Sequence, residues 1–382
     1  MKILIVTTGY PRNDADLSGI FLKRLATAMA RTGVSVTVLA PGDRDAKTRE
    51  SGQGINIVRF VYGPRYLMRV GYGDGGIPEN LRRWPWLFAI LPFFLFSMII
   101  HAIVLAKDCD VIHANWLHTG LFALPAKKIR KKPLVVTLRG SDVKQGASNM
   151  LPFVVSRADA VTTVNKTWAE DLQKKYRCTV CYTPNGVEVS EMAIDPRREF
   201  CIGANETIVL YVGVLRKVKG ADLLAEIAKI TLRLDRSVRF LVIGPGSPQQ
   251  FGLNKLPNVI CAGQLSPKAA LEVYPSCDIF VLPSRSEGRP NALLEAMASG
   301  LPSVAARLPG VVEVLTDECG ILVDTEDTRV FAEAICTLAR NPAMRRIMGE
   351  RGKARVAELS LNWESSARRY LRIFERVHLC AE

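Results

Sequence analysis

Short β-rich apolar runs alternate with segments of helical periodicity along the first half of the chain. Segment 18–33 repeats apolar residues at helical spacing, and Gly33 near its end suits a helix C-terminus. The runs expected to form strands are 2–8, 34–42, 110–116, 133–142 and 158–165. This alternation predicts an α/β fold with an open parallel sheet. Ligands of such sheets gather at the carboxyl ends of the strands, here in the loops 9–19, 115–120 and 139–142 and at Asn165.

A second alternating series follows the Pro-Asn-Gly turn at 184–186. Its apolar runs lie within 208–220, 238–246, 258–263 and 278–284, with helices expected at 221–230 and from Lys268. A chain of 382 residues also exceeds a comfortable single core. We therefore predict a first domain at 1–185 and a second at 186–360. An amphipathic helix at 361–382 is expected to pack back toward the first domain.

The composition is that of a globular protein, with 48% hydrophobic and 23% charged residues. The net charge of +14 is unevenly distributed. Residues 1–185 carry 26 Lys and Arg against 13 Asp and Glu, whereas residues 186–382 carry 25 against 24. The positive first half favours an anionic partner. Zinc-finger spacing, RNP-like aromatic patterns and basic-leucine heptads are not found, so nucleic acid ranks below an anionic membrane surface.

Cysteine usage and the N-terminus both indicate an intracellular protein. Cys178 and Cys181 have neither a second cysteine pair nor a spaced histidine to complete a zinc site. We interpret them as buried thiols in a strand, in a reducing compartment. The apolar run from Ile3 to Val6 is too short for an export signal. We therefore expect a cytoplasmic location.

Residues 84–106 form an uncharged run that is long and apolar enough for a transmembrane helix. Pro92 and His101 interrupt it, and an expected strand follows almost at once, so a span would split the first domain. We predict instead an exposed apolar helix that associates with the inner face of a membrane, helped by the basic cluster at 127–132. The alternative is a fully buried core helix.

Two glutamates flank a Gly-Arg-Pro-Asn turn, Glu287 before a helix expected at 290–299 and Glu295 inside it. The first-turn N–H groups of Asn291 and Ala292 suit a diphosphate. A carboxylate beside a diphosphate needs donors as partners, and sugar hydroxyls provide them. The alternative is that both glutamates are solvated surface residues.

The Glu-x7-Glu pattern within "PSRSEGRPNALLEAMASGLPSVA", residues 283–305, resembles that of family 4 glycosyltransferases. Further segments fall where that family has its landmarks: 18–42, 110–120, 135–143, 183–187, 211–224 and 308–315. The resemblance covers nearly the whole chain. It implies the GT-B architecture, in which two Rossmann-like α/β domains face each other across a cleft. It also implies a retaining transfer from a nucleoside diphosphate sugar.

The resemblance further implies roles for particular residues. Gly19 would meet the donor diphosphate, Lys219 would bind its phosphate, Glu287 would hold the donor sugar and Glu295 the ribose. The remaining donor-binding set is Gly213, Arg216, Gly288, Arg289, Pro290, Asn291 and Ala292. Glu287 and Lys219 are the expected catalytic residues. A fixed cation and helix amides would stabilise the leaving diphosphate, so neither a metal nor another cofactor is expected.

The chain departs from the family at several positions. Val214 stands where many members have Arg, so Arg216 or Lys217 would supply the second positive charge. Asn115 and Arg139 stand where members often have His.

These two substitutions make His118 a candidate stand-in for the missing histidines at an acceptor or sugar site. Asp142 either contributes to that site or caps a helix. For His113 we expect ordinary packing at a strand end.

We therefore predict a retaining, metal-independent glycosyltransferase in cell-surface polysaccharide synthesis. It would move a sugar from a nucleoside diphosphate sugar to a lipid-linked saccharide acceptor at the membrane. The alternatives are a catalytically silent sugar-nucleotide or lipid-binding subunit, a nucleotide-sugar epimerase and a phosphorylase. An epimerase needs no membrane-facing helix, and a phosphorylase of the glycogen type needs a lysine for pyridoxal phosphate in its own sequence context.

Overall fold

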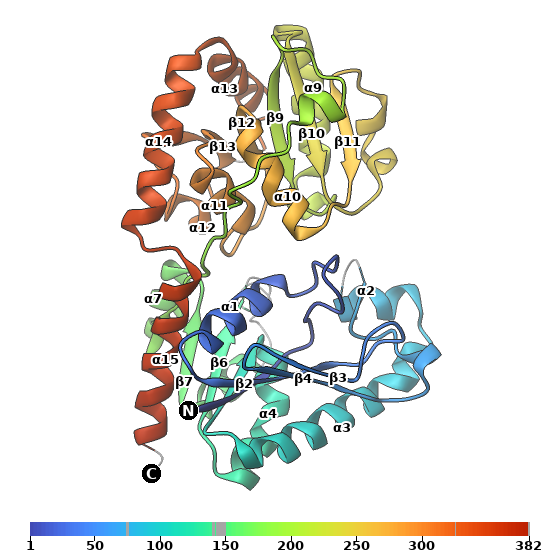
Figure 1. Cartoon of the computed structure of the whole chain (residues 1–382), viewed down its shortest axis with the longest axis vertical. Helices are drawn as coiled ribbons and strands as arrows, with labels where there is room; N and C mark the ends of the chain where they lie inside the picture. Colours follow the sequence, from blue (N-terminus) through green and yellow to red (C-terminus); the bar gives the residue numbers. More distant parts are fainter. Residues whose placement is uncertain (74–75, 140–141, 143–149, 325, 381–382) are drawn as a thin grey trace. The chain divides into compact units, whose positions relative to one another are not determined.

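A computed structural model describes residues 1–73, 76–139, 142, 150–324 and 326–380. The chain forms two compact units, residues 1–186 with 363–382, and residues 187–362 (Figure 1). It therefore passes between the units twice, after Gly186 and after Asn362. Each unit has its own hydrophobic core.

The first unit is built on a sheet of eight strands in the order β3-β4-β2-β1-β5-β6-β7-β8. All neighbours are parallel except β3 and β4. The strands are β1 (Lys2–Val6), β2 (Ser35–Pro41), β3 (Arg49–Gly52), β4 (Ile55–Phe60), β5 (Val111–Asn115), β6 (Leu134–Leu138), β7 (Ala160–Thr163) and β8 (Val180–Tyr182). The sequence pattern misses β3 and β4, and β3 is polar. The strand expected around Cys178 and Cys181 is β8, which has only three residues. Cys181 lies in β8, but it is half-buried rather than buried, as is Cys178 outside the strand.

Helices cover both faces of this sheet (Figure 1). Alternation along β1 sends Ile3 and Ile5 to one face and Leu4 and Val6 to the other. The first face packs against α1 (Ile20–Ala30) and α15 (Trp363–Leu379). The second face packs against α3 (Leu87–Leu105), α4 (Leu117–Arg130), α6 (Met150–Val155) and α7 (Lys166–Tyr176), and α2 (Gly76–Arg83) precedes α3.

The C-terminal helix α15 belongs to the core of the first unit, although it follows the second unit in sequence. Its Tyr370 and Phe374 rings lie 4.9 and 5.2 Å from the ring of His113, between centroids. The Tyr370 hydroxyl lies 3.2 Å from Thr137 Oγ1. Burial lowers the pKa of His113 to about 3, so this histidine is neutral and packs in the core.

Helix α3 has one buried and one exposed apolar stripe. The buried stripe consists of Leu87, Phe94, Met98 and Ala102. The exposed stripe consists of Phe93, Phe96, Ile100 and Val104, which are 41–66% exposed. Full burial is therefore wrong for this helix. It begins at Leu87 rather than at 84, and residues 87–108 are long and apolar enough to cross a membrane by length and composition alone.

The second unit contains six parallel strands in the order β11-β10-β9-β12-β13-β14. They are β9 (Thr207–Val212), β10 (Val238–Ile243), β11 (Val259–Gly263), β12 (Ile279–Leu282), β13 (Ser303–Ala306) and β14 (Gly320–Val323). The helices are α8 (Pro196–Glu199), α9 (Ala221–Leu234), α10 (Pro267–Val273), α11 (Asn291–Ala298), α12 (Pro309–Val312), α13 (Thr328–Arg340) and α14 (Pro342–Glu358). Pro290 is the N-cap of α11, with extended backbone, rather than its first helical residue.

Because Phe374 is fully buried against the first unit's sheet, Phe374→Ala should lower the free energy of unfolding of that unit by about 3–5 kcal/mol. Leu379→Ala on the same helix is the control, since Leu379 is 71% exposed and its truncation should cost less than about 0.5 kcal/mol. Urea unfolding followed by tryptophan fluorescence measures both. Equal, small effects would show that α15 does not complete this core.

Candidate active site

The site in the second unit lies where the strand order changes direction, between β9 and β12. The loop after β9 contains the short helix η3 (Lys217–Lys219) and leads into α9, and the loop after β12 leads into α11. The two loops are joined by a backbone hydrogen bond, in which the Arg285 N–H donates to the carbonyl of Val218 at 3.0 Å. They leave the sheet at the carboxyl ends of adjacent parallel strands, so their side chains converge.

Lys219 and Glu287 form an ion pair at this point. The Lys219 Nζ lies 2.8 Å from both Oε1 and Oε2 of Glu287. The Ser284 hydroxyl donates to Glu287 Oε1 at 2.8 Å. Glu287 is 8% exposed, whereas the Lys219 side chain remains 35% exposed. A buried carboxylate is thus compensated by an ammonium that still reaches solvent.

The close approach of the two loops depends on Gly220. Its backbone is left-handed, with φ 72°, and a Cβ at this position would lie 2.0 Å from the carbonyl oxygen of Pro283. Only glycine fits both conditions without moving the loop. Gly220 therefore allows Lys219, one residue earlier, to lie beside the loop that carries Glu287.

Arg285 fastens the same two loops from their outer side. Its guanidinium makes a two-pronged ion pair with Asp222 in the first turn of α9, at 2.7 and 2.9 Å. It also donates to the Lys217 carbonyl at 2.7 Å and to Glu326 at 2.9 Å. The hydrogen bond to Asp222 is the main reason why the pKa of Arg285 is raised above its usual range.

The helix α11 brings its N-terminus and Glu295 to the same region. The first turn of α11 presents the backbone N–H groups of Asn291 and Ala292, at the positive end of the helix dipole. Glu295 Oε2 accepts a hydrogen bond from the buried Tyr274 hydroxyl at 3.1 Å, which fixes the carboxylate. Glu287 is therefore not a solvated surface residue, whereas Glu295 is half-buried and held by Tyr274. The side chain of Arg289 is buried and points toward Glu313, at 3.6 Å, so its contribution to the predicted donor site would come from its backbone.

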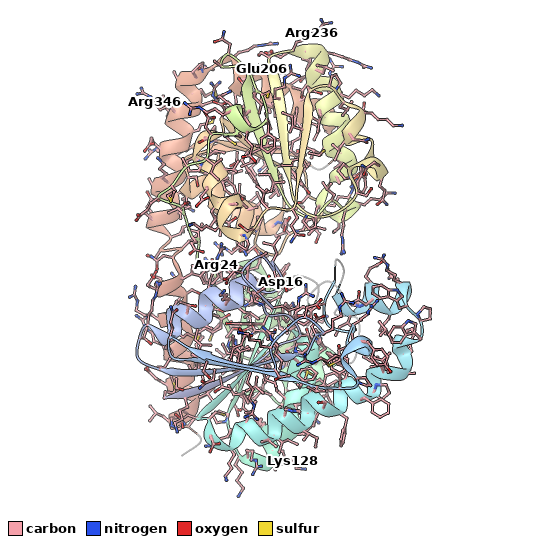
Figure 2. The ribbon with its side chains drawn as sticks, turned by 45° about the vertical axis from the view of Figure 1, so that its right-hand side comes forward. Asp16, Arg24, Lys128, Glu206, Arg236 and Arg346 are labelled. Carbon is pink, nitrogen blue, oxygen red and sulfur yellow. The ribbon has the colours of Figure 1, made fainter. Side chains whose placement is uncertain are left out.

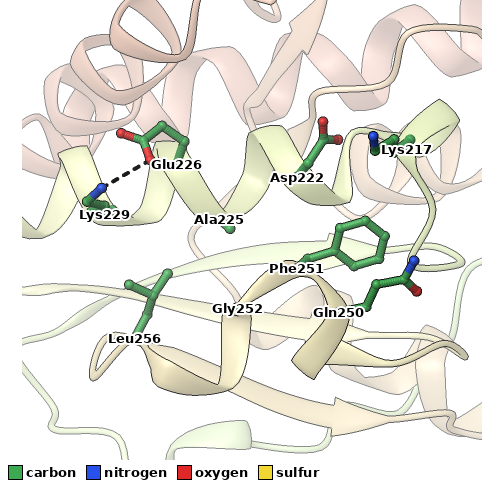
Figure 3. A pocket seen from close by; sticks show the side chains of 9 residues that line it. All are labelled: Lys217, Asp222, Ala225, Glu226, Lys229, Gln250, Phe251, Gly252 and Leu256. Atoms are coloured by element: carbon green, nitrogen blue, oxygen red, sulfur yellow. Dashed lines mark hydrogen bonds and ion pairs between the residues drawn. The ribbon is translucent and has the colours of Figure 1, made fainter.

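The structure separates the two cations that could replace Val214. Lys217 lines a pocket of about 400 Å³ with Asp222, Gln250 and Phe251 (Figure 3). Arg216 is half-buried at the N-cap of η3, and its side chain forms no ion pair with any described residue. Arg216 is therefore the better candidate for the second positive charge.

Gly213 lies against the backbone of Gly244. A Cβ on Gly244 would lie 2.0 Å from the carbonyl oxygen of Gly213.

In the first unit, Gly19 is the N-cap of α1 and lies in close contact with the backbone of the loop after β1. Its φ is 69°, and a Cβ there would lie 2.2 Å from the carbonyl oxygen of Gly9. The helix N-terminus is thereby held beside the carboxyl end of β1. This is the position that the predicted contact with a diphosphate requires.

His118 links the loops after β1 and β5. Its Nε2 lies 2.9 Å from the Thr8 hydroxyl, and its ring stacks on Trp116 with centroids 6.3 Å apart. Burial lowers the pKa of His118 to about 4, so the ring is neutral near pH 7. It can hydrogen-bond a hydroxyl but does not supply a charge.

Arg139, just past β6, is 6% exposed and is held by two asparagines. Its Nε and Nη2 donate to Asn115 Oδ1 at 3.2 and 3.0 Å, and its Nη1 donates to Asn185 Oδ1 at 3.1 Å. The guanidinium carbon lies 4.2 Å from the centre of the Phe21 ring. Burial lowers the pKa of Arg139.

Asp142 caps α4, which is one of its two predicted roles, and a contribution to an acceptor site stays a prediction. Its Oδ2 accepts from the N–H of Leu117, the first residue of α4, at 3.1 Å and from the N–H of Arg139 at 2.9 Å. Burial nevertheless raises its pKa to about 6. Gly140 and Ser141 of the same predicted loop lie outside the described residues.

Acidic pairs in the described part of the chain do not assemble into a metal site. No group of three or more His, Cys, Asp or Glu side chains with suitable geometry occurs among these residues. Asp14 and Asp16, for example, pair with Lys23 and Arg12 at 2.8 and 2.6 Å. Asp16 is labelled in Figure 2.

The structure brings together Lys219 and Glu287 in the second unit, and Asn115 and Arg139 in the first. Sequence reasoning missed the residues that hold them, which are Ser284, Tyr274, Arg285, Asp222 and Asn185. Ser284 and Arg285 lie three and two residues before Glu287, and Asp222 lies three residues after Lys219, so their proximity was available from sequence. Asn185 belongs to the Pro-Asn-Gly turn, but that turn does not reveal its contact with Arg139. Tyr274 carries no motif.

Comparison with known proteins gives consistent results for both units. Residues 18–191 match the family described as "Glycosyltransferase Family 4", and residues 206–341 match "Glycosyl transferases group 1". The chain is 24% identical, over 88% of either chain, to a putative teichuronic acid biosynthesis glycosyltransferase, TuaC, of Bacillus subtilis (strain 168). Its fold is that of sucrose-phosphate synthase from Thermosynechococcus elongatus, with TM-score 0.80, 24% identity and 99% of each chain covered. It is also that of Anabaena Alr3699/HepE in complex with UDP-glucose, with TM-score 0.74, 16% identity and 98% and 100% covered.

The contact between Gly220 and Pro283 predicts a large effect of Gly220→Ala. The matched control is Gly252→Ala, because Gly252 has nearly the same φ of 71° but nothing within 4 Å of a Cβ. The control should cost about 1–2 kcal/mol for the left-handed backbone alone. Gly220→Ala should cost about 1–3 kcal/mol more, because the loop must move to admit the methyl group. Equal unfolding free energies in urea would show that the loops are not held in contact.

Proposed function

The chain belongs to glycosyltransferase family 4, and on that basis we propose that it transfers a sugar from a nucleoside diphosphate sugar to a lipid-linked saccharide, with retention and without a metal. The pairing of Lys219 with Glu287 beside the N-terminus of α11 carries this proposal. This arrangement brings a cation, helix amides and a carboxylate together. The cation and the amides suit a diphosphate, and the carboxylate suits sugar hydroxyls.

In the proposed reaction, the acceptor hydroxyl attacks the anomeric carbon on the face from which the diphosphate leaves. The bond between that carbon and the phosphate oxygen breaks, and the hydroxyl proton passes to an oxygen of the leaving diphosphate. Negative charge grows on the diphosphate, where Lys219 and the α11 amides stabilise it. Glu287 accepts hydrogen bonds from hydroxyls of the donor sugar, and Glu295, held by Tyr274, accepts them from the ribose.

A uridine diphosphate sugar is the first donor to consider. The support is indirect: Alr3699/HepE, which shares the fold, binds UDP-glucose. UDP itself is therefore the probe for nucleotide binding, and the sugar it carries is to be found by comparing donors.

We place the lipid-linked acceptor at the first unit because of its apolar and basic surfaces. The exposed stripe of α3 lies near the end of α4, since the Arg130 Nε donates to the Ile103 carbonyl at 2.8 Å. A groove of about 960 Å³ runs beside α4, lined by apolar Leu121, Leu124 and Phe153 and rimmed by Lys127, Lys128 and Lys131. Lys128 is exposed at this end of the unit (Figure 2). The apolar lining of this groove and its basic rim together suit an anionic lipid at the inner face of a membrane.

Glu287→Gln should reduce the release of UDP from the productive donor by about 10²–10³-fold, because the charge that holds the sugar and positions Lys219 is removed. UDP binding should change little, since UDP lacks the sugar. The measurement is UDP release with EDTA present. Glu318→Gln is the control, because Glu318 is an exposed carboxylate of the same unit.

Four outcomes would count against this function. Equal release by Glu287→Gln and wild type removes Glu287 from the reaction, and loss of release in EDTA removes metal independence. UDP binding without release or transfer from any donor favours a silent binding subunit, whereas conversion of the donor to its epimer favours an epimerase.

Phe96→Glu should reduce binding to vesicles that contain phosphatidylglycerol by about tenfold or more, because burying a phenylalanine is worth about 1.5–3 kcal/mol. Stability should hold, since Phe96 is 66% exposed. Ile347→Glu, at an equally exposed position of the second unit, is the matched control. Co-sedimentation with vesicles with and without the anionic lipid measures both, and equal binding of the two variants would exclude α3 from the membrane contact.

A further inference from the structure

Arg139 is a buried cation that has no carboxylate partner in the described part of the chain. Among the described residues, no Asp or Glu oxygen lies within 4.0 Å of its guanidinium nitrogens, in contrast to the buried Glu287, which is paired with Lys219. Asp142 influences the pKa of Arg139, but its Oδ2 is directed at two backbone N–H groups. Removing a charge from water without pairing it is costly, so proteins rarely leave one in this state.

The hydrogen bonds around Arg139 leave donors in excess. A guanidinium has five N–H groups. Three of them donate to Asn115 and Asn185, so two have no acceptor among the described residues. Because a guanidinium only donates, Asn115 must turn its oxygen toward Arg139. Its Nδ2, which is completely buried, then has no acceptor among the residues that the structure describes.

These donors lie at a fixed place at the carboxyl edge of the first sheet. Asn115 ends β5, Arg139 follows β6, and Asn185 follows β8. The Phe21 ring on α1 packs over the guanidinium and prevents it from swinging away. The cation is thus oriented by groups that do not neutralise it, at the edge where ligands of parallel sheets bind.

We propose that Arg139, with Asn115, binds an oxyanion of the sugar substrate, a carboxylate or a phosphate group, and so selects an acidic sugar over its neutral counterpart. A planar carboxylate or a phosphate can accept from two guanidinium N–H groups at once and supplies the acceptors that the cluster lacks. The inference deepens the proposed function and rests on it. The acidic group can belong to the donor sugar, as in a hexuronic acid, or to the acceptor, as in a sugar phosphate.

Two variants test this role. Arg139→Gln removes the charge. Asn115→Asp keeps the size of the side chain and its Oδ1 contact but gives the guanidinium a carboxylate from the chain itself. Both should lose the preference for acidic ligands, and Asn115→Asp should fold at least as well as the wild type because it pairs a buried charge. Arg82→Gln, at an exposed arginine of the same unit, is the control.

Binding affinity is measured for two pairs of ligands, each with an acidic and a neutral member. The first pair is UDP-glucuronate and UDP-glucose. The second pair, measured with UDP present, is glucose 1-phosphate and methyl glucoside. In the wild type and in Arg82→Gln, the acidic member of one pair should bind about tenfold more tightly than the neutral member. Selectivity in the first pair assigns the oxyanion to the donor, and selectivity in the second assigns it to the acceptor. Equal affinities within both pairs, or selectivity that survives in Arg139→Gln or Asn115→Asp, would overturn the proposal.

A third measurement separates this inference from the proposed function. Inorganic phosphate should raise the Tm of the wild type by more than that of Arg139→Gln or Asn115→Asp, because both variants keep the diphosphate site proposed at Lys219 but lose the oxyanion site. Failure of UDP to bind would count against the proposed transferase reaction alone. A phosphate effect of the same size in all variants would exclude Arg139 as the oxyanion site.

Discussion

The candidate site of the second unit is organised by one ion pair, Lys219 with Glu287. Glu287 is buried, and an unpaired carboxylate at that place would cost several kcal/mol. The pair forms only because Gly220 lets two loops meet at their backbones and Arg285 fastens them through Asp222. In the proposed reaction, a diphosphate would find the ammonium already in position, so little reorganisation would be needed when charge develops on it.

The buried charge of the first unit, that of Arg139, is held by neutral groups and not by an opposite charge. Arg139 is as buried as Glu287, but asparagine oxygens orient it without cancelling its charge. An asparagine contributes a partial negative charge where an aspartate would contribute a full one, so the electrostatic potential around the guanidinium stays positive. The two buried charges therefore differ in their surroundings: that of Glu287 is paired within the protein, whereas that of Arg139 would be paired by the proposed anionic ligand.

Local patterns in the sequence predict much of this structure, and distant contacts do not follow from them. Spacing alone predicts the alternating strands and helices, and the family resemblance indicates Lys219 and Glu287. Neither can reveal that Arg285 reaches Asp222 across 63 positions or that Asn185 reaches Arg139 across 46. Side-chain direction is equally hidden, which is why Arg216 and Lys217 could be distinguished only in the structure.

Helix α3 is a second case in which the sequence pattern does not predict a feature that the structure shows, namely which face of the helix is buried. It is apolar on all sides, so its periodicity cannot tell which face is buried. The structure places Phe94 and Met98 in the core and leaves Phe93 and Phe96 to solvent. An exposed aromatic stripe contributes nothing to folding, and it promotes aggregation unless something covers it. Nearby lysines of α4 would repel a basic partner and attract an anionic one, so apolar contact and charge favour the same lipid surface.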